Sequence, residues 1–395
     1  MKYRLLALVF VVVVLASFSL QSDGQNKEPD EVITPIRFGP QVMAAPTGLT
    51  PAQVRRAYGF DVLTNRGDGQ TIAVIDAFDQ PYIEEDLAVF SQTFNLPPCT
   101  TANGCFRKIT TTKNDTKPPI RQIWALEISL DVEWAHAIAP DARILLVETK
   151  SAKLADLMEG VELAVDNGAT VVSMSWGAPE FEGQLAYDLR FRFLPSTVTL
   201  LASSGDFGTG VFYPAASPYV IGVGGTTLNV DAQGNYISET ALSASGGGLS
   251  AFEDEPSYQM QFGLPNNPDH QRGVPDVAYN ADFATAFAVY SSFPYLGFKG
   301  WIPVGGTSAG APQWAGLFAI VNSMRSQAGK SPLTAATAAL YGAASAQGPA
   351  KFNDITSGSN GTCGPLCTAA PSFDYVTGLG SPRAYRLVPA LVAAP

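Results

Sequence analysis

The sequence predicts an α/β fold in which a mostly parallel sheet is covered by helices on both faces, within a single large domain. Two observations lead to this prediction. Segments with strand character alternate with segments of helical periodicity, and the strand segments are apolar at consecutive positions, not at every second one. Strands without a polar face are typical of a parallel sheet that is buried on both sides.

The elements can be placed in order along the chain. The run TIAVIDAF at 71–78 predicts a buried strand, and 81–94 combines early acidic residues with apolar residues at helical spacing. Residues 97–120 are polar and are predicted to form a loop. No repeat or linker divides 49–395, so one domain is expected. The further predicted strands are 142–148, 170–176, 198–203 and 219–223, and the further predicted helices are 123–139, 154–167, 181–194, 311–327 and 333–344.

Composition excludes some classes of function. The 395 residues include 24 Lys and Arg against 35 Asp and Glu, a net charge of −11. A nucleic-acid-binding protein needs a basic face to neutralise phosphates, so this class is not expected. With 46% hydrophobic and 15% charged residues, the chain has enough apolar surface to build a folded core.

The N-terminal residues predict export. Lys2 and Arg4 precede an uncharged apolar run at 5–20, and small residues follow. This pattern is typical of a signal peptide, here 1–22, followed by a polar linker at 23–48. The alternative is an uncleaved anchor, although the run is short for a membrane span. We therefore expect a secreted or extracytoplasmic protein with no other membrane segment.

The four cysteines form two close pairs in the sequence. Cys99 lies near Cys105, and Cys363 lies near Cys367. In an oxidising compartment each pair is expected to form a local disulfide. A zinc site is not expected, because no histidine is near either pair in the sequence and the pairs are far apart.

Ser308 is the candidate nucleophile. It lies among small residues at 304–312, before a long apolar helix. Small residues let the backbone approach a bound molecule closely, and the N-terminus of the helix supplies positive potential. The alternative is a serine that only caps the helix. The segment 306–310 also matches the G-x-S-x-G elbow of esterases, but no histidine follows Ser308, as that fold requires. His136 precedes Ser308 but lies in a helical run, which favours a structural role.

A pair of carboxylates could act as the base instead. Glu127 and Asp131 are four residues apart in the predicted helix 123–139, so they share one helix face. Their neighbours are apolar, which predicts a buried pair that shares a proton and has one raised pKa. Such a pair can act as a general base in acid. The alternative is an exposed acidic helix face.

Several ordered motifs together resemble the sedolisin family of serine-carboxyl peptidases, which have a subtilisin-like fold with a Glu and an Asp in place of the usual His. The resemblance covers nearly all of 49–395. It rests on the segments 127–135 with 139–140, 203–206, 245–248 with 272–277, 305–309, and 352–355 with 374–382.

The resemblance implies roles for individual residues. Ser308 would be the nucleophile, Glu127 the general base, and Asp131 the residue that orients Glu127. Asp206 would line the oxyanion hole. A carboxyl group can donate a hydrogen bond there only when protonated, so activity is expected in acid.

The same resemblance implies supporting or structural roles for further residues. Asp76 and Trp176 would support the carboxylate pair, although some family members have Glu at the position of Asp76. A C-terminal loop at about 352–381 would bind one Ca²⁺, for which carboxylate and carbonyl oxygens are suitable ligands. The implied ligands are the carboxylates of Asp354 and Asp374 and the carbonyls of Ile355, Ala370 and Ser372.

The resulting expectation is a secreted, acid-active serine-carboxyl endopeptidase that acts on polypeptides as a monomer. Family members usually have a long N-terminal prosegment that blocks the site, and 23–48 is too short to form a core of its own. A non-catalytic binding or surface protein on the same fold is therefore the alternative. A carboxylate-pair glycosidase fits less well, because two carboxylates on one helix face do not flank a sugar ring.

Overall fold

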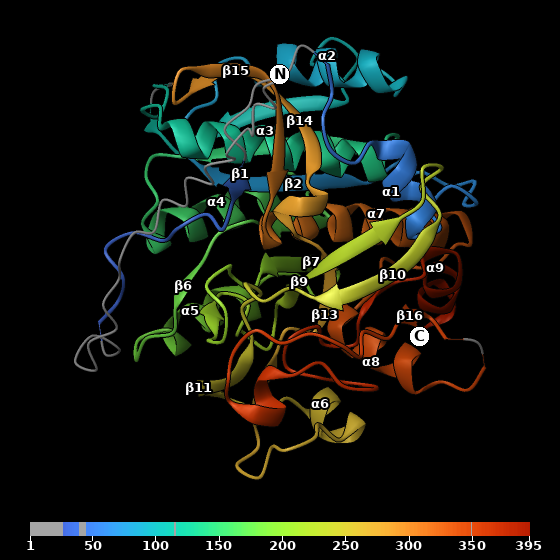
Figure 1. The fold of residues 1–395 in the computed structure, drawn as a ribbon. Coiled ribbons are helices and arrows are strands. Elements are labelled where there is room, and N and C mark those ends of the chain that lie inside the picture. Colours follow the sequence, from blue (N-terminus) through green and yellow to red (C-terminus); the bar gives the residue numbers. More distant parts are fainter. Residues whose placement is uncertain (1–26, 39–44, 114–115, 349) are drawn as a thin grey trace, which may run out of the picture.

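The computed structural model describes residues 27–38, 45–113, 116–348 and 350–395, and its central element is an eight-stranded sheet (Figure 1). The strand order is β10-β9-β7-β5-β2-β4-β3, with β13 also paired to β9. All of these pairs are parallel except β10 with β9. The strands are β2 (Thr71–Ala77), β3 (Phe106–Thr110), β4 (Arg143–Thr149), β5 (Val171–Met174), β7 (Thr199–Ser203), β9 (Ile221–Val230), β10 (Tyr236–Ala241) and β13 (Val277–Asn280).

Helices and smaller sheets surround this sheet. The helices are α1 (Pro51–Ala57), α2 (Ile83–Phe94), α3 (Gln122–Ile138), α4 (Leu154–Asp166), α5 (Leu185–Arg192), α6 (Ser257–Phe262), α7 (Gly310–Gln327), α8 (Ala336–Ser345) and α9 (Ala384–Ala393). The smaller sheets contain β1 (Arg37–Phe38), β6 (Ala178–Pro179), β8 (Phe212–Tyr213), β11 (Gly248–Asp254), β12 (Gln271–Val274), β14 (Phe287–Tyr295), β15 (Phe298–Gly305), β16 (Phe352–Asn353) and β17 (Ser381–Pro382).

The two faces of the sheet bury two separate sets of side chains. In β2, Ile72 and Val74 belong to the core that includes α3 and α7, whereas Ala73 and Ile75 belong to the core that includes α4. Successive side chains of a strand point to opposite faces, so a strand that is apolar throughout supplies both cores. The predicted parallel sheet with helices on both faces is confirmed.

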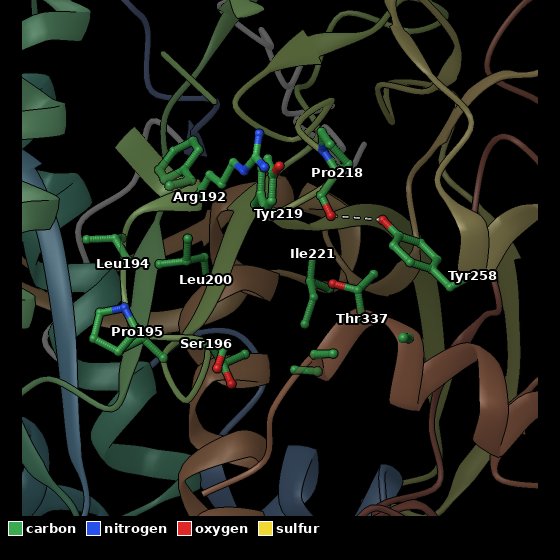
Figure 2. A pocket seen from close by; sticks show the side chains of 16 residues that line it. Arg192, Leu194, Pro195, Ser196, Leu200, Pro218, Tyr219, Ile221, Tyr258 and Thr337 are labelled. Atoms are coloured by element: carbon green, nitrogen blue, oxygen red, sulfur yellow. Dashed lines mark hydrogen bonds between the residues drawn. The ribbon is translucent and has the colours of Figure 1, made fainter. Parts of the chain in front are cut away.

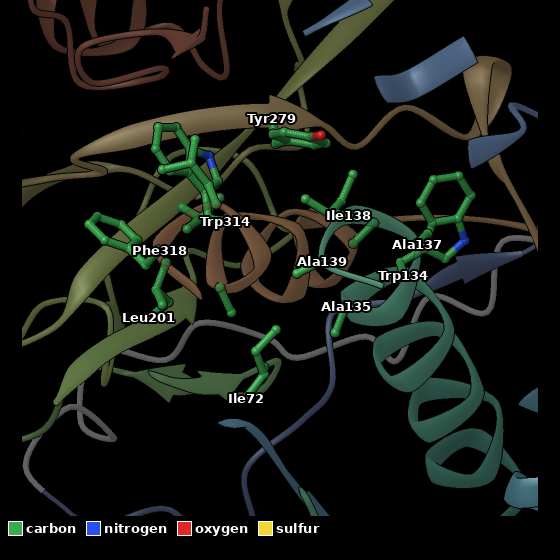
Figure 3. Close-up of a cluster of buried hydrophobic side chains, with 14 of the residues drawn as sticks. Ile72, Trp134, Ala135, Ala137, Ile138, Ala139, Leu201, Tyr279, Trp314 and Phe318 are labelled. Atoms are coloured by element: carbon green, nitrogen blue, oxygen red, sulfur yellow. The ribbon is translucent and has the colours of Figure 1, made fainter. Parts of the chain in front are cut away.

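Helix α3 is buried along almost its whole length. It lies between the sheet and the β14–β15 hairpin, and every residue from 124 to 138 is buried (Figure 1). Trp134 Nε1 donates to the Ala288 carbonyl of β14 at 3.0 Å. Figure 3 shows Trp134 and Ile138 in the core that also contains Trp314 and Phe318 of α7. Any ionisable side chain on this helix is therefore removed from water.

The structure differs from the expected elements in two places. The predicted loop 97–120 contains β3, an edge strand in which Phe106 is buried and Arg107 is exposed. Because one side of an edge strand faces water, its sequence lacks the continuous apolar run of the central strands. Within the predicted linker 23–48, residues 32–38 pack against the domain, and the side chain of Val32 is only 3% exposed.

The predicted signal peptide at 1–22 lies outside the described residues. Among the helices that the structure describes, none is both long enough and apolar enough to cross a bilayer.

Contact between α3 and α7 depends on a glycine. A Cβ at Gly316 would lie 2.8 Å from Ile138 Cβ, whereas a Cβ at Gly342, on the exposed side of α8, would have no neighbour within 4 Å. We expect Gly316→Ala to lower the free energy of unfolding by about 1–3 kcal/mol through overpacking. The matched change Gly342→Ala should raise it by about 0.5–1 kcal/mol, because alanine has the higher helix propensity. Chemical denaturation measures both, and equal effects would contradict the packing argument.

Candidate active site

Ser308 lies in a tight turn between β15 and α7. Gly306 has a φ of 115°, residues Thr307–Ala309 form a 3-10 turn, and α7 begins at Gly310. The backbone carbonyl of Ser308 accepts a hydrogen bond from Ser175 Oγ at 3.1 Å. A Cβ at Gly306 would come within 2.6 Å of Asp206 Oδ2, so the turn needs glycine both for its φ and for space.

Glu127 of α3 faces this turn and is fully buried. Burial raises the pKa of Glu127, and hydrogen bonding to Thr34 and Ser308 opposes that rise. Thr34 Oγ1 donates to Glu127 Oε2. Within the described part of the chain, Ser308 Oγ and Glu127 Oε1 are both buried, and neither has a hydrogen-bond partner of regular geometry. A hydroxyl next to a carboxyl group of raised pKa is suited to proton transfer.

Two further carboxyl groups extend the site behind Glu127. The pKa of Asp131 is held well above its usual range, mainly by burial and to a smaller extent by the charges of Asp76 and Glu127. The pKa of Asp76 is also held well above its usual range, mainly by burial and to a smaller extent by the charges of Glu127 and Glu148. No carboxyl oxygen of Asp76 or Asp131 has a hydrogen-bond partner among the described residues. Like charges this close cannot all be ionised, so the group must hold protons.

Asp206 lies on the other side of the Ser308 turn. Its Oδ1 accepts from the Thr307 backbone N–H at 2.9 Å, whereas Oδ2 is buried and has no partner among the described residues. Burial raises the pKa of Asp206 to about 6, while hydrogen bonding to Thr307 and the charge of Arg37 oppose the rise. Below that pH the carboxyl group is protonated and can donate a hydrogen bond.

Trp176 contacts the backbone next to Asp76. Its Nε1 donates to the backbone carbonyl of Ile75 in β2 at 2.8 Å, not to a carboxylate. It thereby braces the strand that carries Asp76. The neighbouring Ser175 interacts with Asp131 and opposes the rise in its pKa. Apart from its place beside Trp176, no pattern in the sequence indicated this role for Ser175.

The N-terminal residues 32–38, here called the crossing segment, run across the site as an extended strand. Val32 N–H donates to the Ala152 carbonyl at 2.8 Å. Ile33 and Gly177 exchange both backbone hydrogen bonds, at 2.9 and 3.0 Å, as an antiparallel pair. Further along, β1 pairs antiparallel with β15, so that Arg37 is opposite Gly305.

Between these two pairings, the crossing segment touches the candidate catalytic groups. Thr34 contacts Glu127, and the space that a Cβ of Gly306 would need is taken by the Pro35 carbonyl oxygen. Arg37 Nη2 donates to the Asp206 carbonyl at 2.7 Å. Sequence reasoning missed this segment, because its short mixed sequence has no regular period and its partners are distant in the chain.

The predicted calcium loop brings its two carboxylates to the same stretch of backbone. Asp354 accepts from the Ser372 N–H at 3.1 Å, and Asp374 Oδ2 accepts from the Ala370 N–H at 3.3 Å. Ser372 has a left-handed φ of 75°, and Ile355 is buried beside the loop. The side chains and carbonyls here offer only oxygen ligands, which fits a hard cation such as Ca²⁺.

One described pocket lies away from this site. It has a volume of about 280 Å³ and opens near the amino ends of β7 and β9, where Leu200 and Ile221 line it (Figure 2). Ser308, Glu127 and Asp206 lie instead near the opposite, carboxyl ends of the strands. None of the predicted site residues lines this pocket.

Comparisons with known proteins agree with this geometry. The Subtilase family profile matches residues 109–355. Kumamolisin from Bacillus sp. (strain MN-32) is 33% identical over 381 residues, which cover 88% of this chain and 64% of that protein. Sedolisin from Pseudomonas sp. (strain 101) is 32% identical over 247 residues, covering 55% of this chain and 40% of that protein. The chain thus spans less than two thirds of the length of these curated relatives.

A solved structure extends the comparison to three dimensions. Pseudomonas sedolisin, described as a serine-carboxyl proteinase complexed with pseudo-iodotyrostatin, superposes with a TM-score of 0.75 at 27% identity. The match covers 88% of this chain and 98% of the sedolisin chain. A lanthipeptide protease, with a TM-score of 0.56 at 17% identity, shares the fold alone. The chain therefore belongs to the subtilase family and, within that fold, to the sedolisins.

Proposed function

We propose that the protein is an acid-active serine-carboxyl endopeptidase in which Ser308, Glu127, Asp131 and Asp206 carry out peptide hydrolysis. The observation that carries this proposal is the meeting of a buried serine hydroxyl with a buried carboxyl group of raised pKa in the turn before α7. The relatives that the chain matches include peptidases by name.

The proposed reaction has two halves. Ser308 Oγ attacks the peptide carbonyl carbon while Glu127, as the ionised member of the coupled carboxyl groups, takes the hydroxyl proton. Asp131 retains its own proton and keeps Glu127 oriented. Asp206 Oδ2–H donates to the developing oxyanion. Glu127 then gives its proton to the leaving amine, and the acyl group remains on Ser308. Water then attacks the acyl carbon while Glu127 takes its proton, and Glu127 gives this proton to Ser308 Oγ as the carboxylic acid product leaves.

The crossing segment supports a polypeptide as the substrate. It enters and leaves the site, with backbone pairing to Gly177 on one side and to Gly305 on the other. An extended chain is therefore accommodated on both sides of the reacting groups, as an endopeptidase requires. We infer that the segment occupies the place of substrate and must move for turnover.

The proposal also includes a calcium ion, secretion and a monomeric state. One Ca²⁺ would be held by Asp354, Asp374 and carbonyls of the 352–381 loop, where it would stabilise the loop without taking part in the reaction. Secretion rests on the predicted signal peptide at 1–22. A monomer is the simplest arrangement, because the site needs no second chain.

Removal of any one catalytic side chain should abolish most turnover. We expect Ser308→Ala, Glu127→Ala and Asp131→Ala each to lower kcat by about four to six orders of magnitude, with double variants little worse, because the residues act as a unit. Hydrolysis of a peptide blocked at both ends, near about pH 4, measures this and tests endopeptidase activity directly. Undiminished hydrolysis by Ser308→Ala would contradict the proposal, and a folded wild-type protein with no activity would favour the non-catalytic alternative.

Asp206 should set the alkaline limit of activity. Its pKa of about 6 means that the donor proton is present below about pH 6 and is lost above it. Asparagine donates a hydrogen bond at every pH, so Asp206→Asn should extend activity to higher pH while it lowers kcat at the acid optimum. The dependence of kcat/KM on pH measures the effect. An unchanged alkaline limit would show that another group controls it.

Release of the crossing segment should increase activity. Val32 is its buried anchor, and an aspartate there would place a charge among apolar neighbours at a cost of about several kcal/mol. We expect Val32→Asp to raise the initial rate on a short peptide, because the site is open more often. Glu31→Gln, a neighbouring exposed change, should leave the rate unaltered. A lower rate in a folded Val32→Asp protein would mean that the segment completes the site.

Calcium removal should destabilise the fold. An ion that binds only the native state raises Tm, so excess EGTA should lower Tm, and added Ca²⁺ should restore it. In Asp354→Asn/Asp374→Asn, EGTA should have no effect, because both carboxylates are gone. The same Tm for the wild-type protein with and without EGTA would contradict the assignment.

A further inference from the structure

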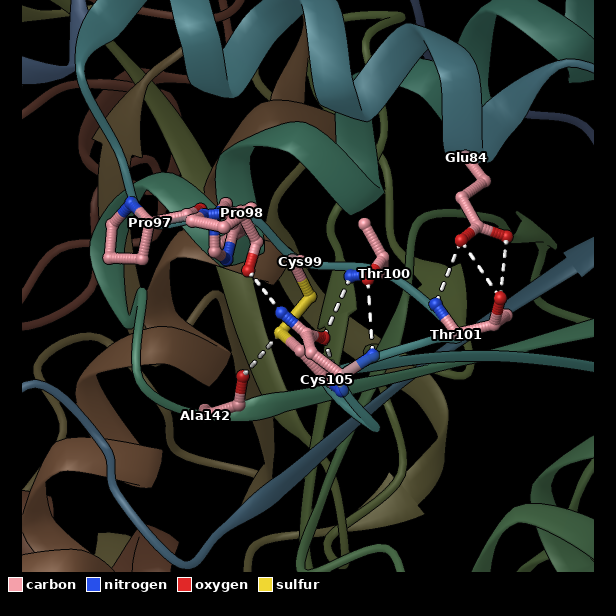
Figure 4. Close-up of a disulfide and its surroundings, with 10 residues drawn as sticks. Glu84, Pro97, Pro98, Cys99, Thr100, Thr101, Cys105 and Ala142 are labelled. Carbon is pink, nitrogen blue, oxygen red and sulfur yellow. Dashed lines mark hydrogen bonds between the residues drawn. A yellow bond between two sulfur atoms is a disulfide. The ribbon is translucent and has the colours of Figure 1, made fainter.

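Cys99, Cys105 and His136 form a compact group that the proposed peptidase reaction does not use. One ligand atom from each lies within 4.8 Å of the others, although His136 is far from both cysteines in the sequence. Cys99 and His136 are buried, and Cys105 is half-buried. In the structure the two sulfurs form a disulfide (Figure 4). No histidine is near either cysteine pair in the sequence, but the fold brings His136 of α3 next to this loop.

His136 is held in the form that binds metals. Its Nε2 lies 2.9 Å from the Pro97 carbonyl oxygen, which can only accept, so Nε2 carries the proton. The other nitrogen, Nδ1, then has a free lone pair, and it has no hydrogen-bond partner among the described residues. Metal-binding histidines usually donate their second N–H to a carbonyl or carboxylate in this way.

The loop that carries the sulfurs is held by bonds other than the disulfide. The side-chain oxygen of Asn103 accepts from the Thr100 N–H at 3.1 Å and from the Cys105 N–H at 3.0 Å. Asn103 Nδ2 donates to the Pro98 carbonyl at 2.8 Å. Cys105 also leads directly into β3, which is hydrogen-bonded to β4. The two thiols are therefore kept near each other after the S–S bond opens.

We propose that reduction of the Cys99–Cys105 disulfide creates a site for a single Zn²⁺ ion, bound by the two thiolates and His136. Two thiolates at about 2.3 Å from a tetrahedral zinc ion are about 3.8 Å apart, a separation that side-chain rotation in the turn can supply. A Cys₂His set leaves the fourth position on the ion for water. The ion and the water can reach the site from solvent beside Cys105, which is only half-buried.

Reduction of the disulfide and binding of the metal are two separate steps. A dithiol reductant transfers two electrons and two protons to the disulfide, giving two cysteine thiols and the oxidised reductant. Zn²⁺ then binds and displaces two protons from the thiols, so the bound state carries two thiolates and a neutral imidazole. The ion would connect the loop between α2 and β3 to the C-terminal part of α3, the helix that also carries Glu127.

The second cysteine pair serves as the internal control. Cys363 and Cys367 also form a disulfide, but they belong to no described group of three metal-ligating side chains. The test therefore uses full-length Cys363→Ser/Cys367→Ser protein, in which Cys99 and Cys105 are the only cysteines. It is reduced with a phosphine, which itself binds zinc weakly, and titrated with Zn²⁺ against a chromophoric chelator at about pH 7.

We expect one zinc per reduced chain and none per oxidised chain. His136→Gln keeps an N–H placed to donate to the Pro97 carbonyl but lacks the Nδ1 lone pair, so its zinc affinity should fall at least tenfold. Equal affinity in His136→Gln, or no binding by the reduced protein, would overturn the proposal.

A second readout covers variants that do not fold well. Co²⁺ in place of Zn²⁺ should give the thiolate charge-transfer absorption in the reduced Cys363→Ser/Cys367→Ser protein. That absorption should be absent when Cys99 and Cys105 are also changed to serine. Its persistence without these cysteines would place the metal elsewhere and overturn the proposal.

Discussion

The burial of helix α3 is the constraint on which the rest of the structure depends. A helix between a sheet and a hairpin has no side that faces water, yet this one carries Glu127, Asp131, Glu133 and His136. Each charged form is disfavoured there, so the carboxyl groups retain protons to higher pH and the histidine loses its proton at lower pH. The same packing that stabilises the core therefore prepares the acid–base chemistry.

Glycines and backbone pairing then bring the remaining groups to that helix. The turn at Gly306 allows Ser308 to approach Glu127 from β15, and the Thr307 N–H holds Asp206 on the opposite side. The indole of Trp176 fixes the backbone of β2 beneath Asp76. These contacts come from strands that end at one edge of the sheet, where side chains from distant parts of the chain can meet.

Local patterns in the sequence predicted the parts of the structure that depend on local order. The parallel sheet, the buried helix with Glu127 and Asp131, and the small-residue turn at Ser308 each have a continuous signature. The edge strand β3, the crossing segment and the proximity of His136 to Cys99 had none, because each depends on partners far away in the chain. Trp176 shows a further limit of prediction from sequence. Its residue type indicated a role at the site, but its hydrogen bond to the backbone of β2 could not be deduced.

The pairing of β1 with β15 has a consequence for association between molecules. When the crossing segment leaves, the backbone groups of Val304 and Gly305 that it pairs with become a free strand edge. Such an edge accepts any extended chain, including the same segment of another copy. Residues 32–38 of one molecule could then fill the site of the next, as in domain swapping. The protein concentration would decide whether the segment fills its own site or that of another molecule, because the contacts made are the same in both cases.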